Sequence, residues 1–364
     1  MSATVGTRTA AMQAIFQGTP AEHAHEAVQA RIEALLARRT PAAQARGGDF
    51  GRLWEHLRDA TRGGKGLRPR LVTSVADAFG TIDDNVITTA AVFEILHTAF
   101  LLHDDVIDQD TLRRGALNIA GHFMQDAGAR GMDAETSRIA GTAAAILAGD
   151  LLISLALRTF AELDVDREIH RELFDVVEDA ILSAAAGELE DVRYASGVIA
   201  SEDEIVQMIA HKTAGYSFVA PMVAGAILAG AQREAVEALE RIGQGLGLVF
   251  QLRDDILGVF GDAETGKSAI GDLREGKQTL LIAFARQCAQ WNEVESVFGT
   301  PTLSEADATR IRHTLEQCGA RAAVEAEIRR VFNETRTNIQ EAPLPESLQH
   351  TLLAFLQESV DRRR

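Results

Sequence analysis

The distribution of proline restricts the fold of this chain more than any other sequence feature. No proline occurs between Pro69 and Pro221, and proline is the strongest breaker of helices. The same interval is rich in Ala, Leu, Glu and Arg, which favour helix. Strand signals are nearly absent, because no Asn-Gly turn joins β-branched runs. From residue 86 to residue 108, apolar side chains recur at helical spacing, at Phe93, Leu96, Phe100 and Ile107. The sequence therefore predicts an all-α protein.

The pattern of apolar residues and helix-start signals divides the chain into helical segments. These are predicted at residues 21–39, 50–62, 67–79, 84–109, 135–162, 167–195, 201–229, 232–260, 276–290, 304–318, 319–339 and 345–361. Ser201 precedes three acids that suit the positive end of a helix, and Thr302 and Glu305 have the spacing of a capping box. Residues 41–49 look like a linker. We predict a tail with an accessory helix over residues 1–49, and one all-helical domain over residues 50–364.

Composition narrows the classes of partner. The 364 residues are 46% hydrophobic, which is enough to build a sizeable core, and they carry a formal net charge of −17. Such an acidic chain repels phosphate backbones, so we exclude nucleic acid as a partner. An anionic small substrate would need metal ions or clustered Arg and Lys side chains to offset this repulsion.

The cysteines and the apolar segments bear on where the protein works. Cys288 and Cys318 are the chain's two cysteines, far apart in sequence and without C-x-x-C spacing, so we expect inert thiols in a reducing compartment. The N-terminus lacks the apolar core of a secretory signal. The apolar window at residues 218–231 is interrupted by Pro221 and is too short to cross a membrane. These features predict a cytoplasmic protein with no transmembrane segment.

The stretch LLHDDVIDQDTLRRG, residues 101–115, places three carboxylates at the end of an apolar helix. Asp104 and Asp108 lie on one helix face, and Asp105 lies about 100° further round. Burying a carboxylate without a partner costs on the order of several kcal/mol of folding free energy, as it does for any charge that is removed from water. Mg²⁺ ions would offset this cost, because they bind carboxylate oxygens and keep positions open for phosphate. The alternative is a charged helix face that only contacts water.

A second pair of acids favours the metal-site hypothesis. In QLRDDILGVFGD, residues 251–262, Asp254 and Asp255 again lie on an apolar segment. The two clusters would form two halves of one site that holds several metal ions. Arginines bind phosphate oxygens in pairs, and lysines add compact positive charge. Basic residues accompany the acid clusters at Lys65, Arg68, Arg70, Arg113, Arg114, Lys212, Lys267 and Lys277. The combination predicts a site in which acids hold cations and the cations hold a diphosphate.

With these motifs the sequence resembles the trans-isoprenyl diphosphate synthases, the polyprenyl synthetase family. The resemblance covers residues 63–280, about two-thirds of the chain. It rests on GGKGLRPRL, EILHTAFLLHDDVIDQDTLRRG, LAGDLLIS, GELEDV, HKTAGYSF and QLRDDILGVFGD followed by GK and GDLREGK, in the family's order. It implies a helical bundle around a deep central cavity, a homodimer, and three Mg²⁺ ions that bind an allylic diphosphate. It also implies the reaction: the diphosphate leaves, isopentenyl diphosphate attacks the allylic cation head to tail, and a proton is eliminated.

The resemblance further assigns roles to individual residues. The metal-binding carboxylates would be Asp104, Asp105, Asp108, Asp254 and Asp255. Arg113, Lys212 and Lys267 would stabilise the leaving diphosphate, with Lys277 nearby. Lys65, Arg68, His97 and Arg114 would hold isopentenyl diphosphate. Thr213, Tyr216 and Gln251 would lie near the cation, and a catalytic set of Lys212, Thr213, Gln251 and Arg113 follows. For His97 the alternative is an ordinary core histidine.

Two positions depart from the family's pattern. The second motif usually reads DDxxD, but its fifth position here is Gly258, so one potential metal contact is missing. Asp254 would then bind the metal, with Asp255 and Asp272 assisting through water. In GELEDV, Glu188 stands where glutamine is more usual.

Product length should depend on residues upstream of Asp104 on the same helix. Ala99 and Phe100 precede it by about 6 to 7.5 Å along the helix axis, and Leu96 and Phe93 lie deeper. In the family a bulky aromatic residue here stops elongation early. The small Ala99 favours a deep pocket, so we predict geranylgeranyl diphosphate as the product, with a geranylgeranyl diphosphate synthase as the identity. Farnesyl diphosphate or longer polyprenyl products are the alternatives, and ordinary core packing is the alternative role for Phe93 and Phe100.

Two other readings of the motifs stay open. A class I terpene cyclase also ionises a diphosphate on an aspartate-rich helix, but it would carry an Asn/Ser/Glu second motif and would not need GGKGLRP. A noncatalytic subunit that modulates another synthase would have lost acids or cations, whereas this chain lacks only the fifth position of its second motif.

Overall fold

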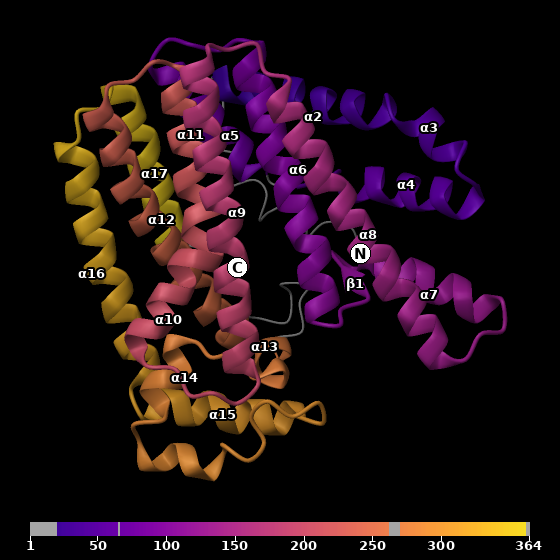
Figure 1. Ribbon diagram of the computed structural model, residues 1–364. Coiled ribbons are helices and arrows are strands. Elements are labelled where there is room, and N and C mark those ends of the chain that lie inside the picture. Colours follow the sequence, from indigo (N-terminus) through magenta and orange to yellow (C-terminus); the bar gives the residue numbers. More distant parts are fainter. Residues whose placement is uncertain (1–19, 65, 262–269, 362–364) are drawn as a thin grey trace. The chain divides into compact units, whose positions relative to one another are not determined.

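A computed structural model describes residues 20–64, 66–261 and 270–361 of the chain (Figure 1). The predicted all-α class is confirmed, because the only strands in these residues are the two-residue β1 (Leu112–Arg113) and β2 (Ala116–Leu117). The longer helices are α2 (Pro20–Ala37), α4 (Gly48–Ala60), α5 (Leu67–Ala78), α6 (Asp84–Ile107), α7 (Ile119–Ala129), α8 (Ala134–Ala161), α9 (Arg167–Ala195), α10 (Glu202–Ile209), α11 (Ala220–Leu228), α12 (Arg233–Phe260), α15 (Glu305–Gln317), α16 (Ala320–Glu341) and α17 (Glu346–Asp361). Short elements are α3 (Thr40–Gln44), the π-helix η1 (Ala210–Val219), α13 (Gly271–Glu275), α14 (Leu280–Ala285) and the 3-10 helix η3 (Ala289–Glu293).

Several predicted segments differ from the structure. The predicted linker at residues 41–49 contains α3 and the start of α4, and no helix was predicted where α7 lies. The predicted helix at 276–290 is wrong: α14 occupies residues 280–285 and η3 follows as a 3-10 turn. The predicted continuous helix at 201–229 is interrupted by η1, in which the Ala220 N–H donates to the Gly215 carbonyl. Pro221 lacks an N–H and clashes with α-helical geometry in the preceding turn, which explains the wider turn there.

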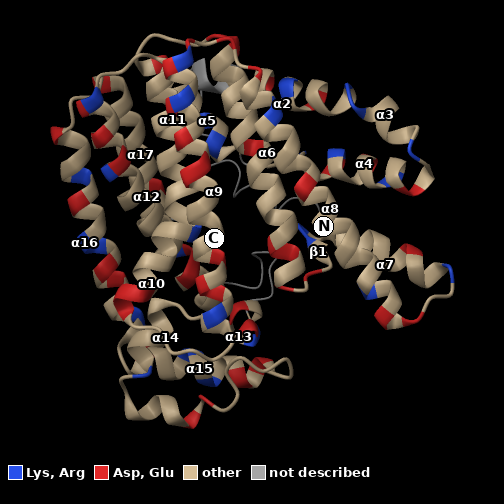
Figure 2. Ribbon diagram, viewed as in Figure 1, with Lys and Arg blue, Asp and Glu red and all other residues tan. Residues whose placement is uncertain are grey.

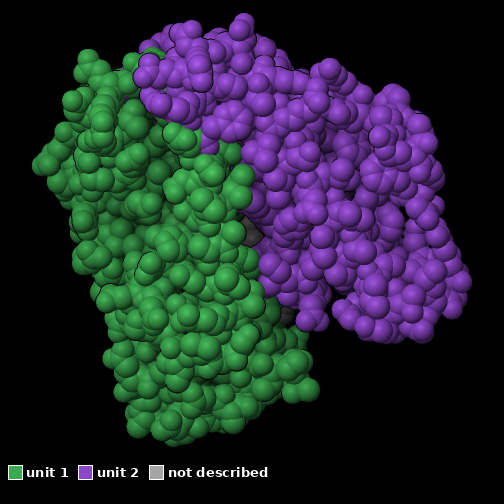
Figure 3. All heavy atoms as spheres, viewed as in Figure 1, with its two compact units in different colours: residues 1–15, 175–364 green, residues 16–174 purple. Residues whose placement is uncertain are grey.

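The chain forms two compact units, which Figure 3 colours separately. Unit 2 comprises residues 16–174, and unit 1 comprises residues 1–15 and 175–364, so the division falls within α9. The two units do not correspond to the predicted domains, which divide after residue 49. That domain boundary stays a prediction.

In unit 2, α6 is the central helix and packs against α2, α5 and α8. Small residues allow the closest approach: a Cβ added to Gly149 of α8 would lie 2.2 Å from the His103 ring of α6. In the same unit, a Cβ on Gly141 would lie 2.4 Å from the Ala120 carbonyl oxygen at the start of α7. The α6 backbone is therefore fixed between its neighbours, and with it the direction of the carboxylates near its end.

In unit 1, α12 is the central helix and packs against η1, α11, α16 and α17. Two α12 glycines sit directly against η1, because a Cβ on Gly247 would lie 2.4 Å from Ala214 and one on Gly243 would lie 2.9 Å from Val219. Phe218 of η1 is fully buried against Phe250 and Phe355. The π-helix is thus locked onto the helix that carries the second acid pair.

Helices α6 and α8 are long and apolar enough to cross a membrane, judged by length and composition alone. The most apolar 18 residues are 72% buried inside the protein in α6 and 44% buried in α8. A buried core helix passes the same test, so the apolar character of α6 is explained by its central position in unit 2. The lower burial of α8 leaves apolar side chains on its surface.

Helix starts follow the capping chemistry expected from sequence, with one shift. Ser201 and Glu204 form a reciprocal capping box at the start of α10. At α15 the box is formed by Ser304 and Asp307 rather than by Thr302 and Glu305, because the helix begins at Glu305. The Ser304 hydroxyl accepts from the Asp307 N–H at 3.2 Å, and the Asp307 carboxylate accepts from the Ser304 N–H at 3.1 Å.

We expect Ser304→Ala to lower the stability of unit 1 by about 1 kcal/mol, because the Asp307 N–H loses the hydroxyl that caps it. Thr302→Ala is the matched control and should change stability by roughly 0.5 kcal/mol or less, since Thr302 is exposed and does not cap α15. The midpoint of urea unfolding, followed by circular dichroism, measures both. Equal effects of the two substitutions would contradict this assignment of the cap.

Candidate functional site

The first acid cluster lies at the C-terminal end of α6, where Figure 2 shows acidic residues. Asp105 is only 1% exposed, and its Oδ1 accepts a hydrogen bond from the Arg113 Nε at 2.8 Å. Its Oδ2 is buried and has no hydrogen-bond partner within the described part of the chain. Burial raises the pKa of Asp105, although the Arg113 guanidinium opposes this rise. A buried carboxylate oxygen of this kind is available to a cation.

Arg113 bridges the neighbouring carboxylates. Its Nη2 lies 3.1 Å from the Asp104 Oδ2 and 2.5 Å from the Asp105 Oδ1. Arg113 comes from β1, which pairs with β2 so that Arg113 is opposite Ala116. Arg114 and Gly115 both have positive φ in this turn. Asp108 is the residue after the last turn of α6, and its backbone N–H donates to the Asp104 carbonyl. The tight hairpin therefore turns an arginine back onto the acids that precede it.

A group of charged side chains surrounds His97 on α6. Burial holds the pKa of His97 well below its ordinary value, and Arg68, Arg113 and Arg114 lower it further. The imidazole is therefore neutral near pH 7. Glu94, one helical turn earlier, is buried, and burial raises its pKa while Arg68 and Arg114 oppose this. Glu94 balances part of the positive charge of the two arginines.

The glycine loop before α5 lies against this charged group. A Cβ on Gly64 would lie 2.5 Å from the Glu94 Oε1, and one on Gly63 would lie 3.6 Å from the Arg114 Nη1. The Arg114 Nη1 also donates to the Arg62 carbonyl at 2.9 Å. A side chain at Gly64 would require either the loop or the Glu94 carboxylate to shift. Gly64 therefore permits the observed close approach of the loop backbone to Glu94.

A separate group of charged side chains lies in unit 1, on η1, α9 and α12. The Lys212 Nζ of η1 lies 2.5 Å from the Asp191 Oδ2 and 2.9 Å from the Glu188 Oε2, both of α9. A Cβ on Gly187 would lie 2.3 Å from the Lys212 backbone nitrogen, so this glycine lets η1 and α9 touch. Lys212 is thus held between two carboxylates. One of them, Glu188, is the position at which glutamine was expected.

A hydrogen-bonded chain connects η1 to the second acid pair. The Thr213 hydroxyl donates to the Gln251 Oε1 at 3.0 Å, and the Gln251 Nε2 donates to the Asp255 Oδ1 at 2.8 Å. Burial raises the pKa of Asp255 to about 8, and the nearby Asp272, Asp254 and Asp191 carboxylates add to the rise while Gln251 opposes it. Without a bound cation Asp255 is therefore largely protonated at neutral pH. Tyr216 lies on the same π-helix as Thr213 and is partly buried.

Gly258 leaves room for a carboxylate from another segment. A Cβ at Gly258 would lie only 1.9 Å from the Asp272 Oδ2, which comes from α13. Asp272 therefore fills the space that a side chain at the fifth position of the second motif would take. Lys277 lies 3.6 Å from the Asp272 Oδ1 and 3.0 Å from the Glu275 Oε2. The glycine and the α13 carboxylate are sterically coupled.

The predicted chain-length residues differ in burial. Phe93, Leu96 and Ala99 are almost completely buried within α6, whereas Phe100 is partly exposed. Phe100 lies four residues before Asp104 and so shares its helix face. Of these four residues, Phe100 is therefore the bulky one that is both partly exposed and on the same helix face as Asp104.

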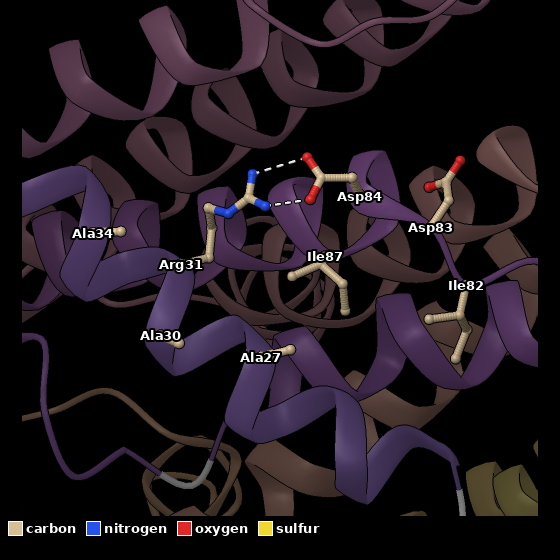
Figure 4. Close-up of a pocket in the computed structure, with 8 residues that line it drawn as sticks. All are labelled: Ala27, Ala30, Arg31, Ala34, Ile82, Asp83, Asp84 and Ile87. Atoms are coloured by element: carbon tan, nitrogen blue, oxygen red, sulfur yellow. Dashed lines mark hydrogen bonds and ion pairs between the residues drawn. The ribbon is translucent and has the colours of Figure 1, made fainter.

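Within the described ranges, no three His, Cys, Asp or Glu side chains converge as a ready-made metal centre. Two predicted cations, Lys65 and Lys267, lie outside the described residues. A pocket of about 510 Å³ lies elsewhere, between α2 and the start of α6 (Figure 4). There Arg31 pairs with both Asp84 carboxylate oxygens, one of them at 3.1 Å. Asp84 lies at the opposite end of α6 from Asp104, about 30 Å along the helix, so this pocket does not belong to the acid cluster.

The sequence did not identify two functional candidates, Glu94 and Asp191, which were read only as parts of longer motifs. Asp272 was predicted to assist metal binding, but its contact with Gly258 was not anticipated. Glu94 could have been noticed as an acid within an otherwise apolar helical stretch. The partners of Asp191 and Asp272 come from other helices, and single-sequence spacing carries no information about such contacts.

Comparison with known proteins identifies relatives over most of the chain. A model of the family described as polyprenyl synthetase matches residues 52–315. A geranylgeranyl diphosphate synthase from Sulfolobus acidocaldarius is 36% identical over 241 residues, which are 65% of this chain and 67% of that protein. A geranylfarnesyl diphosphate synthase from Aeropyrum pernix is 31% identical over 307 residues, covering 83% of this chain and 91% of that protein.

A solved structure is similar over nearly the whole fold. It is a geranylgeranyl pyrophosphate synthase from Corynebacterium glutamicum, complexed with isoprenyl diphosphate and magnesium. The TM-score is 0.86 with 29% sequence identity, and the match covers 93% of this chain and 98% of the other.

The raised pKa of Asp255 predicts a specific pH dependence of stability. The folded protein keeps this proton up to about pH 8, whereas the unfolded chain releases it near the ordinary value of 3.8. The folded state therefore binds more protons in this range, and its stability falls as the pH rises through it. Asp255→Asn mimics the protonated form and removes this contribution. We expect the melting temperature of metal-free Asp255→Asn to increase relative to wild type between about pH 5 and about pH 8.

The exposed Asp179→Asn on α9 is the control, and its difference from wild type should stay constant with pH. Thermal unfolding in a chelator, followed by scanning calorimetry, measures all three proteins. A difference between Asp255→Asn and wild type that does not change with pH would contradict the raised pKa.

Proposed function

The chain belongs to the polyprenyl synthetase family, and from this premise we propose that it makes geranylgeranyl diphosphate with the help of Mg²⁺. It is a prenyltransferase that condenses isopentenyl diphosphate with allylic diphosphates. The observation that supports our assignment of the site is the pairing of acids and cations in each half. Arg113 binds Asp104 and Asp105, and Lys212 binds Glu188 and Asp191.

The acid residues fit divalent metal ions. The buried Oδ2 of Asp105 has no hydrogen-bond partner among the described residues, and the desolvated Asp255 keeps a proton that a divalent cation would displace, so both can supply oxygen ligands. We assign metal binding to Asp104, Asp105, Asp108, Asp254 and Asp255. Asp272 supplies the carboxylate missing at Gly258. Bound Mg²⁺, in the predicted number of three, would stabilise negative charge on the diphosphate as it leaves.

The basic residues then divide between the two substrates. Arg113, Lys212 and Lys267 bind the departing diphosphate, and Lys277 adds positive charge beside Asp272. Lys212 exchanges its contacts with Asp191 and Glu188 for phosphate oxygens as substrate arrives. The extra charge of Glu188, compared with the glutamine expected there, strengthens its competition for Lys212.

Isopentenyl diphosphate binds at the glycine loop in unit 2. Arg68, Arg114 and Lys65 bind its phosphates, and the neutral His97 donates or accepts a hydrogen bond without adding charge. Glu94 orients the arginines through charge.

After the diphosphate leaves, Thr213, Tyr216 and Gln251 face the allylic cation. The Thr213 hydroxyl is oriented by its bond to Gln251, so its oxygen lone pairs point away from that amide. This placement suits stabilisation of a nearby positive charge. Proton elimination from the condensed product then completes the reaction, and the released diphosphate is the available base.

Product length follows from the α6 face before Asp104. Ala99 is small, and Phe100 is the partly accessible bulky residue on that face, with Leu96 and Phe93 deeper in the helix. These four positions favour a twenty-carbon product over a fifteen-carbon one. Relatives bear names for geranylgeranyl, geranylfarnesyl and farnesyl products, so farnesyl diphosphate is the next alternative and a longer product follows it.

We also propose that the protein is a cytoplasmic homodimer, with residues 1–49 as an accessory segment. The surface of α8 carries Ile139, Ile146 and Leu147, with 56%, 41% and 54% of each side chain exposed. Apolar side chains gathered on one long helix favour contact with a second copy. A noncatalytic modulatory subunit is the other possibility, and it is disfavoured because both acid clusters and their basic partners are present.

Product analysis tests this function and the role of Phe100. Purified protein with Mg²⁺, isopentenyl diphosphate and each allylic starter in turn should give a twenty-carbon diphosphate. We expect Phe100→Ala to lengthen the product by one or more isoprene units, because it removes the bulky side chain one helical turn before Asp104.

Phe93→Ala is the comparison variant. If Phe100→Ala keeps the twenty-carbon product while Phe93→Ala lengthens it, the floor of the pocket lies deeper in α6. Absence of elongation by a folded protein with every starter would refute the synthase assignment and favour the modulatory subunit.

The steric coupling of Gly258 and Asp272 predicts that restoring the usual motif is harmful. Gly258→Asp should lower kcat/KM on the order of 10²-fold, because the new side chain displaces Asp272 by more than 1 Å. The double variant Gly258→Asp with Asp272→Gly returns the carboxylate to the usual position and should recover at least part of this loss. A fully active Gly258→Asp single variant would contradict the coupling.

A further inference from the structure

The two cysteines, thirty residues apart in sequence, are neighbours in the fold of unit 1. The Cys288 Sγ lies 3.6 Å from the carbonyl oxygen of Cys318. The Cys318 thiol, which donates to the Leu315 carbonyl at 3.6 Å, is near enough to the Cys288 thiol to raise its pKa. Both residues are only partly buried, so small reagents can reach them. Sequence spacing predicted two inert thiols and gave no sign that they are neighbours.

The local backbone explains why these two residues meet. Cys288 follows α14 and precedes η3, and Cys318 ends α15 before the left-handed Gly319. Helix α15 packs against both α14 and η3. Each cysteine N–H is bonded to a carbonyl in the preceding turn, at 2.9 Å in both cases. The two thiols thus lie at the ends of elements and not inside helices. A disulfide bond between residues at such ends requires less movement of regular structure.

We propose that Cys288 and Cys318 form a reversible intramolecular disulfide when the protein meets a small-molecule disulfide such as oxidised glutathione. The Cys288 thiolate attacks one sulfur of oxidised glutathione, forms a mixed disulfide and releases one glutathione thiolate, which takes up a proton. The Cys318 thiolate then attacks the Cys288 sulfur and releases the second glutathione. In total, two protein thiols are oxidised and one glutathione disulfide is reduced to two thiols.

The bond would brace a segment that contacts the proposed metal site. Between the two cysteines, the Gly299 N–H donates to the Leu273 carbonyl at 3.0 Å. The Arg274 Nε donates to the Leu303 carbonyl at 2.9 Å. Both contacts hold α13, the element that carries Asp272. The disulfide formed by oxidation therefore restricts the unfolded conformations of the segment that supports α13.

The pKa of the Cys288 thiol is raised by burial and by the neighbouring Cys318 thiol. The thiolate is the attacking species, so the reaction is slow at neutral pH and accelerates as the pH rises. This behaviour suits a pair that responds to sustained oxidation rather than one that exchanges rapidly.

The experiment uses the full chain incubated with glutathione buffers from fully reduced to fully oxidised, followed by acid quenching. Free thiols are counted after unfolding, and unreduced proteolytic peptides are analysed by mass spectrometry. We expect both thiols to disappear together and one linked pair of peptides, containing Cys288 and Cys318, to appear, with reversal by dithiothreitol. The melting temperature of the oxidised protein should rise by a few degrees.

Cys288→Ser and Cys318→Ser are matched controls. Each should keep one thiol, accept at most one glutathione and show no rise in melting temperature. Two outcomes with wild type would overturn the proposal: thiols that stay free in every buffer, or glutathione adducts on both cysteines without a linked peptide. Because the test measures thiols in the wild-type protein, it does not depend on the folding of any variant or on the proposed product.

Discussion

A carboxylate at the end of a buried helix requires a nearby positive charge, and much of this structure serves that requirement. Asp105 is almost completely removed from water, and the Arg113 guanidinium offsets its charge. The β1–β2 hairpin brings Arg113 back to the acids at the end of α6. In unit 1 the same requirement is met differently, because Asp255 keeps a proton and Lys212 is shared by two acids. In each unit, buried acids are thus balanced by a proton or by a basic side chain.

Close backbone contacts hold these charges in position. Gly64 permits the loop to lie on Glu94, Gly187 permits η1 to lie on α9, and Gly258 leaves room for Asp272. In each case a Cβ would meet another atom at 2.5 Å or less. Close packing of helices therefore does more than stabilise the core, because it fixes where the charged side chains point. The departure at Gly258 then has a physical explanation, since a carboxylate from α13 occupies the same space.

Much of the fold could be predicted from local signals, and much of the site could not. The long helices α8, α9 and α12 were predicted closely, because proline is absent and apolar residues recur with helical spacing. The π-helix η1 was missed, since its effect on the helix depends on Pro221 together with packing against α9 and α12. Acid pairs and basic residues were visible in the sequence by type and spacing. Their partners, such as Glu94 for Arg114 or Cys318 for Cys288, come from distant segments and depend on tertiary packing.

The most direct test of this account is the rate of condensation by Asp104→Asn in a titration with MgCl₂, measured beside wild type and beside the exposed variant Asp179→Asn. If Asp104 binds metal that stabilises the leaving diphosphate, kcat should fall by on the order of 10²- to 10³-fold, with a higher Mg²⁺ requirement and an unchanged melting temperature. Asp179→Asn should behave as wild type. Turnover by Asp104→Asn at the wild-type rate and the wild-type Mg²⁺ requirement would contradict the central role given to this carboxylate.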